Sequence, residues 1–383
     1  MELIKIDEAL RSAASRIDIT SAMYEEAVAH YQSVATYLDN RGLPVQIRPY
    51  GSILSGTPVR PLADDEDGYF DIDMAVIVSG ADIGSSPEAI RSDVQSRLEE
   101  SDRYKGMLTV DDMCITVEYV ANGTQGGFRL DLASCVANPD CARALSCRTA
   151  PRYSKEATAI ARRSGSWVES NPEGLGQWFL DINEGFAEAA RRARKSTIAA
   201  GSPLYASVDP VPDQLYRSNL QCAVQIAKRS RDVYYLRADH DDRPGSFVLL
   251  ILFGFIAEQL APNSSIYDIL ASFVSNMREA RTGALVSRSG MLGCSGEWSL
   301  ENPVFGENVI SGWTNSEAAT FFRWVDSLGQ DLENLLRGGF KASASLESMF
   351  GRKIGNTAYA DLGMPAIAAA TQVSPRKPWG LYD

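Results

Sequence analysis

The sequence predicts an α+β protein with two lobes, a mixed α/β unit followed by a helical subdomain. Before Ala150, short segments with alternating apolar and polar residues predict four strands, at about 45–50, 69–78, 114–120 and 127–134. Beyond Ala150, longer segments with helical spacing dominate. A chain of 383 residues exceeds one typical domain, which also favours two packed subdomains.

The elements of the first part follow in order along the chain. From Ile6 to about Asn40 an apolar stripe at helical spacing predicts one long helix or two. The segment Arg41–Pro44 contains a glycine and a proline, which end helices. A further helix is expected near 86–100, between the second and third strands.

The second part is expected to be almost entirely helical. Five helices are predicted, at about 174–198, 212–235, 244–260, 264–280 and 315–338. Prolines between 203 and 212 mark a break, and 283–312 is expected to be a long irregular connection. We therefore expect a catalytic core with a long N-terminal helix at 1–165, a helical subdomain at 166–371 and a flexible tail at 372–383.

Composition and charge exclude several classes of protein. A formal charge of −12 argues against a protein that coats long nucleic acid, and we interpret the basic run Arg191–Lys195 as a solvated helix face. The longest apolar run, Phe247–Ala257, is far shorter than the roughly 20 residues that span a bilayer and predicts a buried helix. The first residues lack the pattern of a signal peptide, so we expect a cytoplasmic protein with no membrane association.

The cysteines give no clear metal signature. Cys135, Cys141 and Cys147 recur at equal intervals, but this spacing is not that of a zinc knuckle. Free thiols are the expected state of the six cysteines, and whether these three bind a metal is left open. With two histidines in the chain, a Ser-His-Asp hydrolase is disfavoured.

The decisive motif joins a phosphate-binding turn to a pair of carboxylates. Gly51 and Ser52 would offer backbone amides and a hydroxyl to a nucleoside triphosphate, because glycine allows the main chain to approach phosphate closely. Asp71 and Asp73 lie two apart on a predicted strand, so they point to one face and together suit a divalent cation. The acidic loop Pro61–Gly68 lies between the Gly51–Ser52 turn and this strand. We interpret it as solvated, with weak cation binding as the alternative.

A third carboxylate is expected on a later strand. The alternation in 127–134 places Phe128, Leu130 and Leu132 on the core face and leaves Asp131 on the other. Asp131 would then meet Asp71 and Asp73 across a sheet. Three such carboxylates suit a site with two Mg²⁺ ions for in-line nucleotidyl transfer, with Mn²⁺ as an alternative ion.

A second group of polar residues is predicted in the helical part. Helical spacing puts Gln221, Gln225 and Lys228 near one face, from which Lys228 would reach a phosphate. Ser246 precedes an apolar helix, where free amides and the helix dipole favour an anion. The residues alone leave open the alternatives that Lys228 is a surface cation and Ser246 an N-cap.

Several stretches resemble one bacterial enzyme family. Three occur in many nucleotidyltransferases: Gly51–Ser52 with Gly56–Pro61, Phe70–Asp73 and Leu130–Asp131. Three more are particular to the bacterial group: Ser170–Phe179, Ala223–Asp232 and Glu301–Asn308. Together they resemble the bacterial cGAS/DncV-like nucleotidyltransferases (CD-NTases), the cyclic oligonucleotide synthases of CBASS anti-phage systems, through nearly the whole chain.

The resemblance implies a fold, a reaction and several binding residues. It implies a polymerase-β-like core, an oligoadenylate-synthase-like helical subdomain, and Lys228 and Ser246 on the donor triphosphate with Phe247 stacking on a base. Where the family often shows Lys-Arg-His-Arg-Asp, this chain has Ser230 in place of the histidine. The implied activity is Mg²⁺-dependent, template-independent synthesis of a cyclic di- or trinucleotide from ATP and other NTPs.

Alternatives and regulation stay open at this point. A linear oligonucleotide synthase or an RNA-tailing nucleotidyltransferase would use the same three acids, and the sequence separates these rivals poorly. An inactive nucleotide-binding or partner-binding module is disfavoured, because all three acids are retained. The resemblance also implies a regulatory CBASS partner that acts on the C-terminal tail. The sequence settles neither the base, nor the ring size, nor the 2′-5′ or 3′-5′ linkage of the product.

Overall fold

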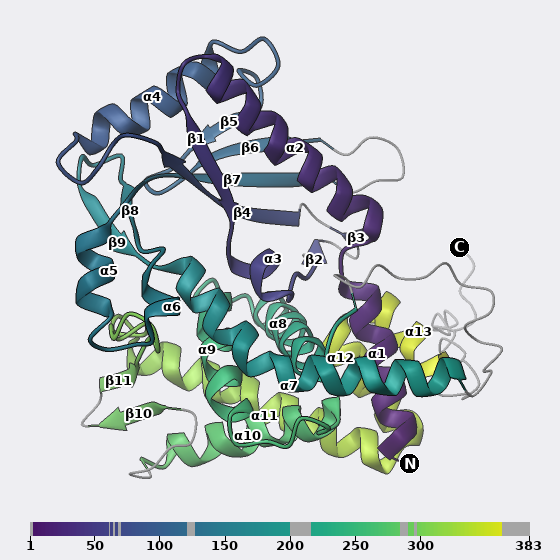
Figure 1. Ribbon diagram of the computed structural model, residues 1–383. Helices are drawn as coiled ribbons and strands as arrows, with labels where there is room; N and C mark the ends of the chain where they lie inside the picture. Colours follow the sequence, from purple (N-terminus) through teal and green to yellow (C-terminus); the bar gives the residue numbers. More distant parts are fainter. Residues whose placement is uncertain are drawn as a thin grey trace, which may run out of the picture.

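The computed structural model describes residues 3–361, apart from 61, 64–65, 68–69, 121–126, 200–215, 284–289 and 295–296. Figure 1 shows a lobe built on a β-sheet above a lobe of packed helices. Two large clusters of buried apolar side chains, one in each lobe, form separate cores. The predicted α+β class with two lobes is confirmed.

One seven-stranded mixed sheet forms the upper lobe. Its main path runs β1-β4-β7-β6-β5, and β8 and β9 extend it from the far end of β7. β4 and β7 are parallel, whereas the other pairs are antiparallel. The strands are β1 (Val45–Pro49), β4 (Phe70–Val78), β5 (Leu108–Val110), β6 (Ile115–Tyr119), β7 (Phe128–Ala137), β8 (Thr158–Ala161) and β9 (Trp167–Ser170).

Two helices cover one face of this sheet. α2 (Ser21–Asn40) and α4 (Pro87–Glu99) pack against the even-numbered residues of β4, from Phe70 to Val78, and against β7. The alternation of a strand therefore sends Asp71 and Asp73 to the opposite face. That face looks toward the helical lobe and carries the polar site.

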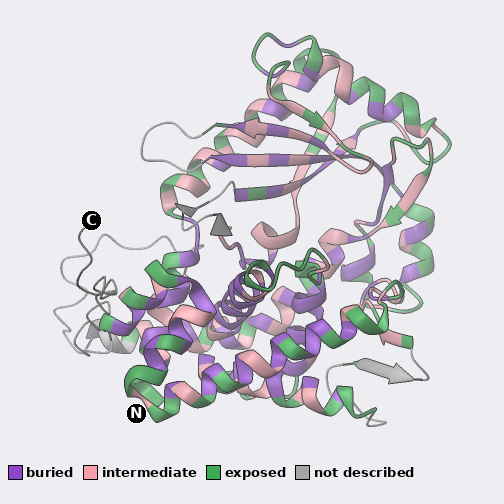
Figure 2. Ribbon diagram, turned by 180° about the vertical axis from the view of Figure 1, so that it is seen from behind, coloured by how far each residue is buried: buried purple, intermediate pink, exposed green. Residues whose placement is uncertain are grey.

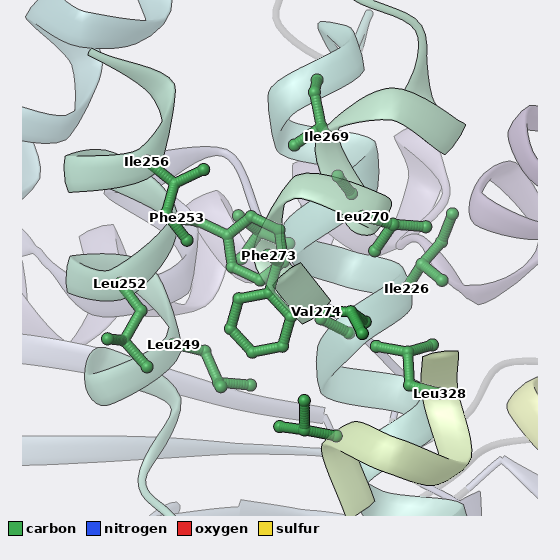
Figure 3. Packing of buried hydrophobic residues seen from close by; sticks show 14 of the residues in the cluster. Ile226, Leu249, Leu252, Phe253, Ile256, Ile269, Leu270, Phe273, Val274 and Leu328 are labelled. Carbon is green, nitrogen blue, oxygen red and sulfur yellow. The ribbon is translucent and has the colours of Figure 1, made fainter. Parts of the chain in front are cut away.

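The helical lobe surrounds a buried central helix. α8 lies at its middle and has fourteen buried residues. It packs against helices that precede it in the chain and against helices that follow it. Phe253 and Phe273 stack with ring centroids 4.6 Å apart at the centre of this core (Figure 3). The helices are α7 (Pro172–Ala199), α8 (Asn219–Arg237), α9 (Ser246–Ala257), α10 (Ile266–Arg281), α11 (Asn315–Arg337), α12 (Gly339–Phe350) and α13 (Arg352–Asp361).

The first helix belongs to the helical lobe. The predicted helical segment at 6–40 is split into α1 (Leu3–Ile17) and α2, and α1 buries Ile6, Leu10 and Ile17 among the helices of the second half. Arg217 makes a two-point ion pair with Asp18, at 2.7 and 3.1 Å, just before α8. The chain therefore begins in one lobe and crosses to the other, which cuts across a simple boundary near residue 165.

Several local predictions need correction. The connection 283–312 contains a hairpin, β10 (Met291–Cys294) and β11 (Glu297–Leu300), and is not wholly irregular. The predictions omitted α12, α13 and the strands β8 and β9, since short amphipathic segments give weak periodic signals. The expected tail at 372–383 and the break at 203–212 lie outside the described residues.

Figure 2 shows that burial follows the inner sides of the helices and the central strands. Even the apolar helix α9 is only twelve residues long, and within the described ranges we find no helix with both the length and the apolarity needed to cross a membrane. Nine of the twelve residues of α9 are instead buried in the core of the helical lobe.

The close contact between α9 and α7 makes a stability prediction. A Cβ atom at Gly254 would lie 2.2 Å from Cη2 of Trp178, whose side chain is packed against its surroundings. Gly254→Ala should therefore destabilise the fold by about 1–3 kcal/mol through overpacking. Gly185→Ala, on α7 with its nearest neighbour a Pro262 carbon at 3.2 Å, is the control. Equal melting temperatures of the two variants would contradict the packing.

Candidate active site

The Gly51–Ser52 turn opens a short helix beside the acidic strand. α3 (Gly51–Ser55) follows Tyr50, whose backbone N–H donates to the carbonyl of Asp73 at 3.0 Å. Gly51 has φ +59°, and a Cβ atom there would lie 2.4 Å from Oδ2 of Asp73. Glycine is thus needed both for the backbone conformation and for the close approach to the carboxylate.

The parallel pairing of β4 with β7 brings the three aspartates together. Asp73 and Asp131 are register partners, and Asp71 precedes Asp73 on the same face of β4. All three carboxylates line one cavity of about 550 Å³ together with Gly51 and Ser52. The two strands therefore have the placement that the sequence predicts, while the catalytic role of these residues stays a prediction.

The pKa values of all three aspartates are raised. Burial, then the charges of Asp131 and Asp71, raises the pKa of Asp73 to about 6. The pKa values of Asp71 and Asp131 are also raised, chiefly by desolvation. Asp71 is exposed to solvent, whereas Asp73 is only partly exposed, and the pKa of Asp73 is the one that is raised strongly.

This arrangement fits a divalent cation in its chemistry. The donor set consists of carboxylate oxygens, and a cation among them would relieve the mutual repulsion that raises their pKa values. In the described residues no three such side chains are grouped tightly enough to hold an ion. Asp131 Oδ1 accepts a hydrogen bond from Thr116 Oγ1 at 2.6 Å, which orients its carboxylate.

Lys228 faces the site from α8 and is buried. Its Nζ donates to the carbonyl and Oγ1 of Thr57, at 3.0 and 2.9 Å, just after the Gly51–Ser52 turn. Burial, together with the nearby Arg231, lowers the pKa of Lys228 to about 7. The alternative that Lys228 is a surface cation is wrong, since 5% of its surface is exposed.

Ser246 and Phe247 lie at the first turn of α9, on the cavity wall. The N-cap of α9 is Gly245, so the alternative that Ser246 is the N-cap is wrong. Ser246 Oγ instead accepts from both terminal nitrogens of the buried Arg231, at 3.4 Å each. Phe247 is half exposed and lies on the cavity rim.

Arg231 is a site residue that sequence reasoning missed. Its guanidinium also donates to Asp232 Oδ1 and to the carbonyl of Pro244, at 2.8 and 2.7 Å, which ties the start of α9 to α8. Further unassigned residues line the cavity, among them Asn171, Arg243, Asn302, Phe305 and Glu307. Most lie within the family-like stretches Ser170–Phe179, Ala223–Asp232 and Glu301–Asn308, which is the signal that marks them.

None of the described cysteines lines the cavity. Cys135 and Cys141 are buried in different apolar clusters, and Cys147 is exposed. The five cysteines that the structure describes are free thiols.

In the acidic segment 61–68, Asp64 and Asp65 lie outside the described residues, and Glu66 and Asp67 form the short strand β3, paired with β2 (Leu62–Ala63).

Comparison with known proteins finds two curated relatives. A c-di-GMP synthase of Roseivirga ehrenbergii is 23% identical over 91% of this chain and 84% of its own length. The cyclic dinucleotide synthase CdnG of Bradyrhizobium diazoefficiens is 25% identical over 97% of this chain and 92% of its own. The chain thus resembles cyclic dinucleotide synthases along nearly its whole length. No protein-family model matches this chain.

Solved structures support the same fold. The structure of Bradyrhizobium diazoefficiens CdnG in complex with GTP has a TM-score of 0.66, with 21% identity, and covers 94% of this chain and 98% of that chain. E. coli MS115-1 CdnC with ATP gives 0.59 at 14% identity, covering 90% and 97%. CdnC in complex with HORMA gives 0.58 at 14% identity, covering 90% and 96%. At these identities the likeness concerns the fold alone.

The contact between Gly51 and Asp73 makes a prediction for the site. Gly51→Ala should leave the protein folded and displace the Asp73 carboxylate, because the new Cβ takes up its space. Binding of a non-hydrolysable GTP analogue, measured by calorimetry, should weaken strongly.

Gly80→Ala provides the matched control. Gly80 has φ +80° and no heavy atom within 4 Å of its Cβ position, so the variant carries only the backbone strain of about 1–3 kcal/mol. Equal nucleotide binding by the two variants would show that the approach of Gly51 to Asp73 is unimportant.

Proposed function

We propose that this protein is a CD-NTase that makes a cyclic dinucleotide or trinucleotide second messenger from NTPs, releasing pyrophosphate, in CBASS anti-phage signalling. The proposal rests on one observation above all: three aspartates from two paired strands line the same cavity as the Gly51–Ser52 turn and Lys228. The two relatives, a c-di-GMP synthase and a cyclic dinucleotide synthase, support this function.

Each residue of the cavity has a proposed role. Gly51, Ser52, Lys228 and Ser246 bind the donor triphosphate, and Phe247 stacks on a base. Asp71, Asp73 and Asp131 would hold two Mg²⁺ ions, or Mn²⁺, which when bound lower the pKa of the attacking hydroxyl and neutralise the leaving pyrophosphate.

The proposed reaction is an in-line displacement. A ribose hydroxyl oxygen forms a bond to the α-phosphorus while the bond from that phosphorus to the α,β-bridging oxygen breaks, and pyrophosphate leaves with the electron pair. Asp131 accepts the hydroxyl proton. A second round on the linear intermediate, at the same three acids, closes the ring.

Regulation is proposed to act through the end of the chain. The segment 372–383 lies outside the described residues and would be available to a partner protein. The complex of E. coli CdnC with HORMA is a precedent for a partner bound to a protein of the same fold. We do not expect long nucleic acid to be a substrate, given the formal charge of −12.

The product identifies the activity. Incubation with each labelled NTP, and with all four together, in Mg²⁺ or Mn²⁺ should release pyrophosphate and give a product that resists phosphatase, because a closed ring has no terminal phosphate. Mass spectrometry then gives the bases and the ring size. A phosphatase-sensitive product would instead favour a linear oligonucleotide synthase or an RNA-tailing enzyme.

The matched variants for this assay are Asp71→Asn and Asp102→Asn. Asp71→Asn should abolish both the linear and the cyclic product while retaining nucleotide binding, because one triad serves both rounds. Asp102→Asn, at a fully exposed carboxylate of the sheet lobe, should be as active as the wild type. Accumulation of linear product by Asp71→Asn would contradict a shared triad.

The lowered pKa of Lys228 predicts pH-dependent nucleotide binding. Above pH 7 the free lysine is largely neutral, whereas a bound triphosphate favours the charged form, so binding takes up a proton. The affinity for a non-hydrolysable GTP analogue should therefore fall by up to about tenfold per pH unit between pH 7 and 9, since one proton is linked to binding.

Calorimetry at pH 7, 8 and 9 measures this slope. Lys228→Met should bind more weakly at pH 7 and lose the slope, while Lys105→Met, at an exposed lysine, should retain it. The same slope in Lys228→Met as in the wild type would assign the proton to another group.

A further inference from the structure

Side chains on the polar face of α8 donate hydrogen bonds to the backbone of the segment that follows the Gly51–Ser52 turn. Gln221 Nε2 donates to the carbonyl of Ser55 at 3.0 Å, and Gln225 Nε2 donates to the carbonyl of Pro58 at 2.7 Å. Lys228 completes the series at Thr57, between these two contacts. Donors at i, i+4 and i+7 of one helix thus meet three carbonyls within the four-residue segment 55–58.

These contacts satisfy backbone groups that have lost access to water. α3 has only five residues, so the carbonyls at its C-terminal end lack partners within the helix. Residues 55–58 are buried, and a buried carbonyl without a hydrogen bond costs roughly 1–3 kcal/mol. The amide donors of α8 therefore determine where this end of α3 can lie.

The amide of Gln221 is fixed from two directions. Its Oε1 accepts from the N–H of Ser218 in the capping box of α8, at 3.0 Å, while its Nε2 faces the turn. Gly56 has φ +67°, and a Cβ atom there would lie 2.2 Å from Gln221 Nε2. The sequence thus leaves room at Gly56 for this side chain.

The other end of α3 is held by the acidic strand. Tyr50 bonds to the backbone of Asp73, and Gly51 lies against the Asp73 carboxylate. The short helix is therefore fixed between β4 and α8, that is, between the two lobes. Its first residues, Gly51 and Ser52, are those that face the cavity.

We propose that Gln221 and Gln225 are positioning residues for nucleotidyl transfer, which hold the Gly51–Ser52 turn in register with Asp73 while nucleotide binds. This inference rests on the proposed function of the same site. The two amides are uncharged, so an incoming triphosphate competes for Lys228 and leaves them in place. Lys228 can then exchange Thr57 for a phosphate without releasing the turn.

Gln225→Met is the most direct test. Methionine has a similar length and no N–H donor, and Gln225 Oε1 has no hydrogen-bond partner within the described residues, so the variant removes one contact, that to Pro58. Amide hydrogen exchange should become faster at Gly56 and Thr57 in the nucleotide-free protein. The kcat for pyrophosphate release should fall by about tenfold or more, with a smaller change in KM, since misplaced reacting groups cost rate.

Ser230→Ala is the matched control on the same helix. It removes a buried hydrogen bond of α8, from Trp324 Nε1 at 3.2 Å, that does not touch the turn. It should lower the melting temperature and leave both exchange at 56–57 and kcat unchanged. Gly56→Ala tests the contact from the other side, because its Cβ displaces Gln221, and it should reproduce the Gln225→Met pattern.

The outcomes separate the inference from the proposed function. A wild-type protein that releases no pyrophosphate from any NTP overturns the function, and hydrogen exchange at 56–57 then still decides whether α8 holds the turn. Unchanged exchange in both Gln225→Met and Gly56→Ala overturns the inference. So does faster exchange with an unchanged kcat in an active enzyme.

Discussion

The parallel pairing of β4 with β7 is the constraint on which the rest of the molecule depends. It places Asp73 opposite Asp131 and turns both toward the helical lobe, while the alternate residues of the same strands enter a largely apolar core. A shift of one residue would exchange the two faces. The apolar face therefore secures the register, and the register places the carboxylates.

This placement brings carboxylates with raised pKa values and a lysine with a lowered pKa into one cavity. The acids are disfavoured in their charged form by burial and by one another, and Lys228 is disfavoured in its charged form by burial. A ligand that combines phosphate with divalent cations would relieve both kinds of strain at once. Burial and like-charge pairs shift pKa values in this way at many functional sites.

The two lobes are joined through polar contacts at this same cavity. α8 belongs to the core of the helical lobe, yet its polar face bonds the turn that precedes the acidic strand. α1 and the Asp18–Arg217 pair provide a second connection on the outer side. Geometry at the phosphate turn thus depends on how the helices pack, although the turn itself lies in the sheet lobe.

The sequence by itself determined the strands near 45, 70, 115 and 128, the helix face of Gln221, Gln225 and Lys228, and the candidate acids, because periodicity of 2 or 3.6 is a local property. Tertiary structure decided that α1 joins the second lobe, and that Arg231 holds Ser246. It also decided that the amides of α8 bond the carbonyls at 55 and 58. The contacts of α8 with residues 55 and 58 join positions more than a hundred residues apart, and no local pattern specifies them.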